Sequence, residues 1–195
     1  MSKKLKKIIY VYNSAAYLHN FRLNLMLTMK RNGWEVVAVS PYDSAAEKIK
    51  AHEIRFEELE LDRKGMKPLK DLGVLLRLIR IYRREKPSIV HHFTIKPVIY
   101  GTLAARLAGI PGIVNLVPGL GYVFSKGGLL QRLVEKMYSF AFSPRVQVVF
   151  QNPDDRQYFI EKKMVLDRQT HLICGSGVNT ELFAPSKPKP SDTLV

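Results

Sequence analysis

Residues 91–97, HHFTIKP, bring two histidines, a threonine and a lysine together directly before a predicted helix. Side chains alternate along a strand, so one of His91 and His92 should point into the packing layer of the sheet. Thr94 and Lys96 fall in the following loop, where functional groups often collect. A lysine beside a helix N-terminus would attract a phosphate group. We therefore expect a ligand site here, although either histidine alone could instead be a hydrogen-bonded structural residue.

The segment YNSAAYLHNFR, residues 12–22, offers a second place for a ligand. It lacks the G-x-G-x-x-G fingerprint of dinucleotide-binding proteins, and the chain has no P-loop. Its small residues, Ser14 to Ala16, would still let a ligand approach the backbone, and the N-terminus of the next helix could hold a phosphate. A plain turn is the alternative interpretation.

The segment NLVPGLGYVFSKGG, residues 115–128, contains four glycines and one proline, which is typical of a mobile or tightly turned loop. The loop carries a cluster of apolar side chains, namely Leu120, Tyr122, Val123 and Phe124. Exposed clusters of this kind often mark interaction sites. With Lys126 and Arg132 nearby, the cluster could enter a membrane interface or hold a lipid chain. The alternative is that it folds back over the core.

The chain shows no complete active site of a familiar kind. No pair of Asp and Glu residues, no Ser–His–Asp order and no metal-ligand spacing stands out. The single cysteine, Cys174, excludes a disulfide framework and a cysteine metal cluster, and it is expected to be a small core residue. We therefore expect neither a metal nor a cofactor.

The composition favours an anionic partner. The 195 residues contain 31 Lys and Arg against 17 Asp and Glu, a formal charge of +14. Such an excess suits nucleic acid, phosphorylated small molecules or an anionic membrane face. No apolar run approaches the roughly 20 residues that span a bilayer, and the N-terminus MSKKLKKIIYVY does not resemble a signal peptide. The cytosol, or a membrane surface facing it, is therefore the expected location.

The positive charge is concentrated in residues 62–86, with nine Lys and Arg against three acidic residues. The spacing of apolar residues predicts an amphipathic helix. The stripe expected to face the sheet is Leu69, Leu72, Leu75, Leu76, Ile79 and Tyr82. The basic side chains expected to remain outside are Arg77, Arg80, Arg83, Arg84 and Lys86. Only the basic face would then be free for a partner, unless it is simply a solvated helix face.

Predicted strands and helices alternate along the chain. Strands are expected at residues 6–13, 34–41, 54–61, 88–93, 112–117, 145–152 and 170–174. Helices are expected at residues 16–33, 44–53, 62–86, 96–109, 128–142 and 153–163. Ser44 and Glu47 have the spacing of a capping box, and Asn152 can act as an N-cap. The alternation predicts a doubly wound, mostly parallel α/β sheet of the Rossmann-like kind. Ligands bind such sheets at the carboxyl ends of the strands, where the three segments described above lie.

Three longer segments together resemble a known family. They are IVHHFTIKPVIYGTLAARLAGIPGIVNLVPGLGYVF at 89–124, VVFQNPDDRQYFI at 148–160 and ICGSGVNTELFAP at 173–185. Their order is similar to the N-terminal half of a family 4 retaining glycosyltransferase with the GT-B fold. The most similar branch builds bacterial capsule, lipopolysaccharide O-antigen and other glycans on polyprenyl diphosphate. By this resemblance, residues 1–174 form a Rossmann-like acceptor-side domain, and residues 175–195 form an interdomain linker and a truncated tail.

The resemblance implies transfer of a hexosyl or N-acetylhexosaminyl unit from a nucleotide-sugar donor to a lipid-linked glycan acceptor, without a nucleic acid partner. The donor would bind mainly to a C-terminal domain that this sequence lacks, so the fragment alone would be inactive. The leaving diphosphate would be stabilised electrostatically. The enzyme would lie in the cytoplasm as a peripheral protein on the inner face of the plasma membrane.

The resemblance also implies residue roles. It gives catalytic roles to His92 and Lys96. The implied substrate contacts are Asn13, Ser14, Thr94, Asn115, Gly119, Leu120 and Gly121. The implied membrane contacts are Tyr122, Phe124, Arg77, Arg80 and Arg84.

Two other functions are compatible with parts of the sequence. A non-catalytic α/β module that binds an anionic ligand or nucleic acid would fit the basic charge, but the chain lacks aromatic RNP strands and a GXXG clamp. A nucleotide-sugar dehydrogenase or epimerase is disfavoured by the missing glycine fingerprint.

Overall fold

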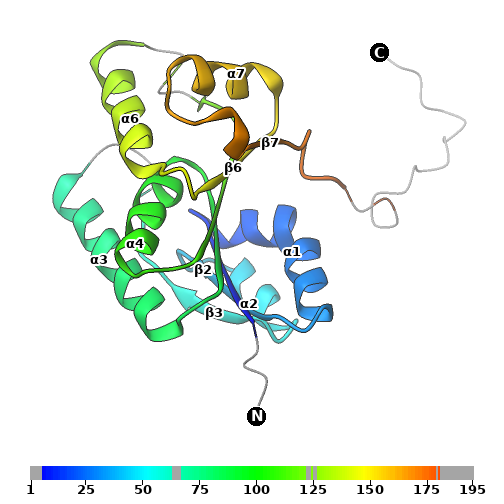
Figure 1. Cartoon of the computed structure of the whole chain (residues 1–195). Coiled ribbons are helices and arrows are strands. Elements are labelled where there is room, and N and C mark those ends of the chain that lie inside the picture. Colours follow the sequence, from blue (N-terminus) through cyan, green and yellow to red (C-terminus); the bar gives the residue numbers. More distant parts are fainter. Residues whose placement is uncertain (1–5, 63–66, 122–123, 125–126, 179, 181–195) are drawn as a thin grey trace, which may run out of the picture.

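The computed structural model describes residues 6–62, 67–121, 124, 127–178 and 180. Within these residues, seven parallel strands form one sheet in the order β3-β2-β1-β4-β5-β6-β7 (Figure 1). The strands are β1 Lys7–Val11, β2 Glu35–Ser40, β3 Arg55–Glu58, β4 Ile89–Phe93, β5 Gly112–Val117, β6 Gln147–Phe150 and β7 Thr170–Leu172. The predicted doubly wound α/β fold is confirmed, and each predicted strand is present with its ends shifted by a few residues.

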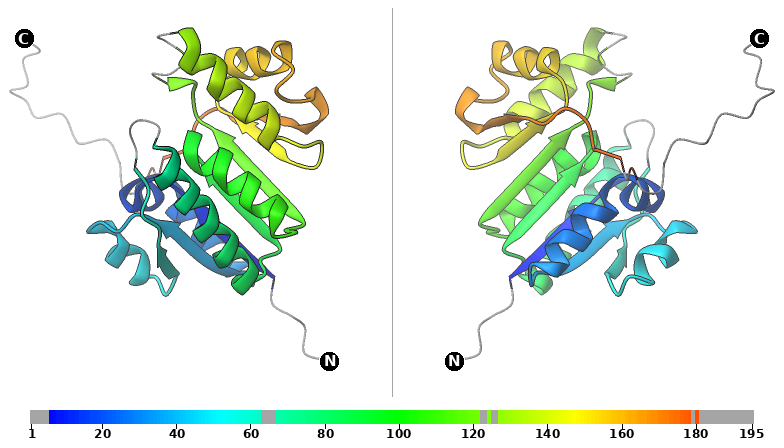
Figure 2. Two further views of the ribbon diagram at one scale, coloured as in Figure 1. Left: turned by 90° about the vertical axis from the view of Figure 1, so that its left-hand side faces the viewer. Right: turned by 90° about the vertical axis from the view of Figure 1, so that its right-hand side faces the viewer.

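The helices cover the two faces of the sheet unequally. One face carries α1 (Ala15–Arg31) and α2 (Ala45–Lys50), which pack on one apolar cluster of the core. The other face carries α3 (Pro68–Glu85), the π-helix η1 (Pro97–Gly101), α4 (Thr102–Leu107), α6 (Gly128–Ala141) and α7 (Pro153–Glu161). A short 3₁₀ helix, η2 (Asp167–Gln169), precedes β7. Right-handed crossovers require this division, because the chain winds first toward β3 and then toward β7 (Figure 2).

One of the two predicted helix caps is confirmed. The side chain of Asn152 accepts a hydrogen bond from the backbone N–H of Asp155 at 2.8 Å at the start of α7. The predicted capping box at Ser44 is wrong, because Ser44 has helical backbone angles and makes no side-chain cap. The carboxylate of Asp43, one residue earlier, accepts instead from the N–H of Ala45 at 2.9 Å.

The apolar face of α3 matches the predicted one only in part, since Tyr82 is buried and Leu75 and Ile79 pack against the core as expected. Val74, Leu78, Ile81 and Tyr82 are buried against the sheet, whereas the side chains of a second set are exposed, namely Leu69, Leu72 and Leu76. Both sets have helical spacing, because apolar residues cover more than one side of α3. Periodicity alone therefore could not show which of the two sets faces the sheet. Polar contacts at both ends of the helix fix its rotation instead.

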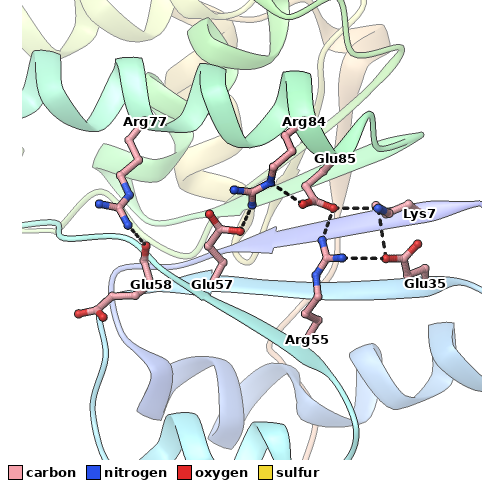
Figure 3. Close-up of polar contacts among 8 residues, drawn as sticks. All are labelled: Lys7, Glu35, Arg55, Glu57, Glu58, Arg77, Arg84 and Glu85. Carbon is pink, nitrogen blue, oxygen red and sulfur yellow. Dashed lines mark hydrogen bonds and ion pairs between the residues drawn. The ribbon is translucent and has the colours of Figure 1, made fainter.

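A network of charged side chains ties the end of α3 to the sheet (Figure 3). Glu85 accepts from Lys7 Nζ at 2.8 Å and from Arg84 Nε at 2.9 Å, and it also pairs with Arg55. Arg84 further pairs with Glu57, and Arg77 donates to the backbone carbonyl of Glu58 at 3.2 Å. Arg77 and Arg84 thus hold α3 on β3, yet both side chains remain exposed, and the membrane contact expected for them stays a prediction.

The Glu85 network predicts a loss of stability in acid. Burial by itself raises the pKa of Glu85, but hydrogen bonds from Lys7, Arg55 and Arg84 outweigh it and lower the pKa from 4.5 to about 2. The network therefore stabilises the fold above pH 4.5 and loses this effect as the pH falls from 4.5 toward 2. After a discount for the partly exposed arginines, we expect a contribution of about 1–2 kcal/mol.

Urea denaturation at pH 7 and pH 3 tests this expectation. Glu85→Gln should lower the free energy of unfolding at pH 7 and reduce the difference between the two pH values. Glu47→Gln removes an exposed pair with Lys50 and should change little. An unaltered pH dependence in Glu85→Gln would refute the assignment of the acid sensitivity to this network.

Candidate functional site at the carboxyl edge of the sheet

The sheet reverses its winding direction between β1 and β4. These strands are neighbours, with Val11 paired to His92, yet the chain leaves them in opposite directions. Folds of this kind bind ligands where the loops diverge at such a switch point, and we call the region between the loops after β1 and β4 the crevice. Four of the residues expected to form the site, Asn13, Ser14, Thr94 and Lys96, belong to these two loops.

Thr94 has an unusual backbone at this crevice. Its φ is +68°, a left-handed value that a β-branched residue rarely adopts. Its Oγ1 is buried and has no hydrogen-bond partner among the described residues. Strain of this kind costs on the order of 1–3 kcal/mol and is found mainly at functional sites. The geometry therefore supports Thr94 as a site residue.

Lys96 is held by a buried ion pair. Its Nζ lies 2.7 Å from Asp71 Oδ1, and the side chains of Lys96 and Asp71 are only 13% and 4% exposed. Tyr100 donates a hydrogen bond to the other oxygen of Asp71 at 3.2 Å. Burial, together with the charge and hydrogen bond of Asp71, raises the pKa of Tyr100 to about 12. The first turn of α3 thus fixes the position of Lys96.

His92 and Asn115 lie in the core instead of at the surface of the crevice. Both side chains are fully buried. Asn115 Oδ1 accepts hydrogen bonds from His92 Nδ1 at 2.8 Å and from Thr102 Oγ1 at 3.0 Å. Because Nδ1 of the neutral His92 ring carries the proton, Nε2 accepts a hydrogen bond from the Tyr82 hydroxyl at 2.9 Å. Burial lowers the pKa of His92 to about 4, although its bond with Asn115 raises it. The structure therefore does not place either residue where a substrate could touch it.

Gly101, the last residue of the π-helix, packs directly on the His92 ring. A Cβ at this position would lie 2.4 Å from Cδ2 and 2.6 Å from Nε2 of His92. Only glycine permits this approach. π-helical turns are often found at functional sites, and this one follows Lys96 directly.

Arg22 and His91 lie on the opposite face of the sheet, and neither is among the residues expected to be catalytic or to contact a substrate. Arg22 is 6% exposed, its Cζ lies 4.7 Å from the Phe93 ring centroid, and its Nε has no hydrogen-bond partner among the described residues. Burial lowers the pKa of Arg22. Burial also lowers the pKa of His91 to about 3, and the charges of His92 and Arg22 lower it further in the same direction. The feature of the sequence that could have indicated Arg22 is its position as a single arginine among the buried residues of α1.

The N-terminus of α1 is already occupied by a carboxylate. Asp43 Oδ2 accepts from the backbone N–H of Ala16 at 3.1 Å and from the Ser14 hydroxyl at 3.3 Å. Ser14 is buried. A phosphate at this helix end would be repelled by Asp43, so the phosphate expected there is disfavoured.

The loop after β5 folds back in part. Leu120 and Phe124 pack against the core, with the Phe124 ring 5.9 Å from that of Tyr158. The expected contact of Phe124 with a membrane is therefore not supported. Gly119 is partly exposed, and Gly121 is exposed with a φ of +65°. Tyr122 and Val123 lie outside the described residues.

The helices α3, α4 and α6 form an outer layer that faces the viewer in the left view of Figure 2, and each of them carries exposed apolar side chains. On α3 they are Leu69, Leu72 and Leu76, at 87%, 50% and 57% exposure, which we call the leucine stripe. On α4 and α6 they are Leu107, Leu129, Leu133 and Phe140. Arg80 and Arg83 continue the leucine stripe along α3 and are exposed. The basic side chains expected to remain outside are all exposed, which confirms that expectation for Arg77, Arg80, Arg83, Arg84 and Lys86.

In the described part of the chain, no helix is long and apolar enough to cross a bilayer, and no group of His, Cys, Asp and Glu residues is arranged to hold a metal ion. Cys174 is exposed, so its expected burial in the core is wrong. It follows β7, which lies at the edge of the sheet that the described residues form.

Residues 7–152 match the family described as "Glycosyl transferase 4-like". This chain belongs to that family. The match includes strands β1 to β6 and hence both loops of the crevice.

Two curated relatives of this glycosyl transferase 4-like chain act on lipid-linked sugars, according to their names. The Escherichia coli UDP-Gal:alpha-D-GlcNAc-diphosphoundecaprenol alpha-1,3-galactosyltransferase is 30% identical over 118 residues, 60% of this chain and 30% of that protein. The Campylobacter jejuni N,N'-diacetylbacillosaminyl-diphospho-undecaprenol alpha-1,3-N-acetylgalactosaminyltransferase is 22% identical over 183 residues, 92% of this chain and 48% of that protein. The chain thus spans less than half the length of either relative.

A solved structure of a glycosyltransferase from Rickettsia africae has the same fold. It superposes with a TM-score of 0.67 at 17% identity, covering 96% of this chain and 47% of that one. At this identity, the likeness shows the fold alone.

Proposed function

We propose that this chain is the acceptor-side half of a retaining glycosyltransferase that moves a sugar from a nucleotide-sugar to a polyprenyl-diphosphate-linked acceptor in polysaccharide synthesis. The family match over the strands that form the crevice is the observation that carries this proposal. The two named relatives support the class of acceptor. The donor would bind mainly to a second domain that completes the full-length protein.

The crevice has the features that such a reaction needs from this half. Thr94 and Lys96 lie at the switch point, where the acceptor hydroxyl and the donor sugar would meet. Lys96 would offset the charge of the leaving diphosphate or orient the acceptor. Asn13, Gly119 and Gly121 would contact the acceptor from the adjoining loops. His92 and Asn115 would act by positioning the π-helix that follows Lys96.

A transfer assay tests the proposed function. The full-length protein, supplied with radiolabelled UDP-sugars and a polyprenyl-diphosphate-linked N-acetylglucosamine acceptor, should form a labelled lipid-linked disaccharide. Retention of the anomeric configuration should be seen by NMR. The absence of transfer with any UDP-sugar and any lipid-linked acceptor, combined with tight RNA binding at physiological salt, would support a non-catalytic binding module instead.

The proposed protein would lie on the cytoplasmic face of the plasma membrane through the layer of α3, α4 and α6. Exposed leucines can enter the interface, and the arginines that follow them, Arg80 and Arg83, can contact anionic headgroups. The formal charge of +14 favours the same attachment. Arg80 thus keeps its proposed role in membrane contact.

Binding to vesicles that contain anionic lipid tests the membrane surface. Replacing Leu69, Leu72 and Leu76 together with glutamine should weaken binding about tenfold or more, since each leucine loses apolar burial in the interface. Raising the salt concentration should weaken binding of the native chain as well.

The matched control is Phe21→Gln with Leu25→Gln, which removes exposed apolar side chains from α1 on the other face of the sheet. This control should bind as the native chain does. Equal binding by the α3 variant, or loss of binding by the α1 variant, would move the membrane surface away from α3.

A further inference from the structure

A hollow lies at the amino edge of the sheet, between the ends of α3 and α4, and its volume is about 440 Å³. The two helices pack side by side (Figure 2), and the connections that lead from them into β4 and β5 contribute Pro87, Ser88 and Pro111 to its lining. The crevice lies at the other end of β4, a five-residue strand about 16 Å long. The hollow is therefore separate from the crevice, and neither the family match nor the names of the relatives assign a ligand to it.

The charged side chains that line the hollow are all positive. Arg83 and Lys86 supply two cations, Ser88 supplies a hydroxyl group, and Ile110 and Pro111 supply apolar surface, whereas no Asp or Glu belongs to the described lining. The side chains of Arg83 and Lys86 are exposed, and neither forms an ion pair or a hydrogen bond with another described residue. The hollow thus carries positive charge that the described part of the protein does not neutralise.

The acidic residues at this end of α3 are already bound to other cations. Glu85 pairs with Lys7, Arg55 and Arg84, and Glu57 pairs with Arg84 (Figure 3). The cations of α3 that face β3 are therefore neutralised within the protein, whereas the two that line the hollow are not. The dipole of α3 stabilises cations at its C-terminus without a carboxylate. Both side chains consequently remain able to bind an anion.

The rest of the lining indicates the class of anion. A nucleotide is disfavoured, because the one aromatic residue of the lining, Tyr82, is buried and bonded to His92 and so offers no ring on which a base could stack. The ends of α3 and α4 carry carbonyl oxygens that lack helical N–H partners and can accept hydrogen bonds from hydroxyl groups. A phosphate joined to a short chain with hydroxyl groups would match both the cations and these carbonyl oxygens, whereas inorganic phosphate would match only the cations.

We propose that this hollow binds a glycerophosphate group, with the phosphate at Arg83 and Lys86 and the glycerol hydroxyls at the carbonyl oxygens of the two helix ends. Ser88 would donate a further hydrogen bond to the phosphate. Free glycerol phosphate and the headgroup of phosphatidylglycerol both contain this group. A headgroup could reach the hollow from the proposed membrane surface, since Leu107, which is 61% exposed, directly precedes Ala108 of the lining. Binding here would require neither sugar transfer nor an acceptor in the crevice.

Titration of the 195-residue chain with glycerol 3-phosphate tests the site. Shifts in ¹H–¹⁵N spectra should be concentrated at residues 83–88 and 108–111, with a Kd of about 1 mM or tighter. Inorganic phosphate should bind at least about threefold more weakly, because it cannot use the carbonyl oxygens. Equal binding of inorganic phosphate would overturn the assignment to glycerophosphate, and the absence of shifts at these residues would overturn the site itself.

Two double variants of equal net charge separate the hollow from the general positive charge. Arg83→Gln with Lys86→Gln should weaken binding of glycerol 3-phosphate about tenfold or more. Lys48→Gln with Arg168→Gln removes the same charge from exposed side chains on α2 and η2 and should change binding less than about twofold. All four side chains are exposed, so both variants should fold, which thermal denaturation checks. Equal weakening in the two variants would overturn the proposed site.

Vesicles distinguish the two sources of the group. Phosphatidylcholine vesicles with the same share of phosphatidylglycerol or of phosphatidylserine carry equal net charge, but only the first kind offers a glycerol headgroup. If the lipid is the ligand, the native chain should bind the phosphatidylglycerol vesicles at least about threefold more tightly, and Arg83→Gln with Lys86→Gln should remove this preference. Equal binding to both kinds of vesicle, together with the expected shifts from glycerol 3-phosphate, would support the site with the free compound as its ligand.

Discussion

Replacing Lys96 by alanine is expected to reduce sugar transfer by the full-length protein about 100-fold or more, because a cation beside the reacting groups is lost. The same substitution should destabilise the fold. It removes the cation paired with Asp71, whose side chain is 4% exposed, and breaking a buried ion pair in this way costs about 3–5 kcal/mol. The two effects must therefore be measured separately, by kcat/KM in the transfer assay and by urea denaturation.

A double variant separates the catalytic effect from the structural one. Lys96→Met combined with Asp71→Asn removes both charges, and an asparagine can still accept the hydrogen bond from Tyr100. We expect the double variant to recover most of the lost stability, since an uncharged pair carries no desolvation penalty. Its transfer activity should remain low. Recovery of transfer together with stability would show that Lys96 only supports the fold, and full activity in Lys96→Ala would remove it from the site.

Gly101→Ala is expected to destabilise the chain by about 2–3 kcal/mol through overpacking. The new Cβ would lie 2.4 Å from the His92 ring. The ring cannot move aside, because it is fully buried and hydrogen-bonded on both sides, to Tyr82 and to Asn115. Thermal and urea denaturation of the 195-residue chain measure this effect directly.

Gly73→Ala is the matched control, because it makes the same change in a helix where the Cβ meets nothing within 4 Å. It should stabilise the chain by about 0.5–1 kcal/mol through helix propensity. Opposite signs for the two substitutions would confirm that contact with His92 sets the requirement for glycine at position 101. A neutral or stabilising effect of Gly101→Ala would contradict the packing described here.

Much of the fold could be predicted from local patterns. The strand around β5, GIVNLV, is apolar almost throughout, as a strand covered on both faces must be. Asn152, Pro153 and two aspartates mark the start of α7 through the chemistry of a helix N-terminus. These signals act within a few residues of the chain, so the sequence exposes them directly.

The candidate site was predicted less completely. Alternation along β4 required His91 and His92 to point to opposite faces, but it could not show which neighbours would enclose each ring. His92 was expected to have a catalytic role, and it proved to be enclosed by Tyr82, Gly101 and Asn115. Asp71 was not selected, because its contact with Lys96 joins residues 25 positions apart.

The sequence by itself determined the order of strands and helices, the carboxyl-edge position of Thr94 and Lys96, and the excess of positive charge. These properties follow from side-chain periodicity, from the rule that parallel strands end at one edge, and from composition. The tertiary structure alone decided which stripe of α3 is buried, which arginines of α3 bond to β3, and which residues hold Lys96. Those outcomes depend on pairing between distant charges, such as Glu85 with Lys7 and Asp71 with Lys96, because such pairs fix the rotation of a helix that is apolar on more than one side.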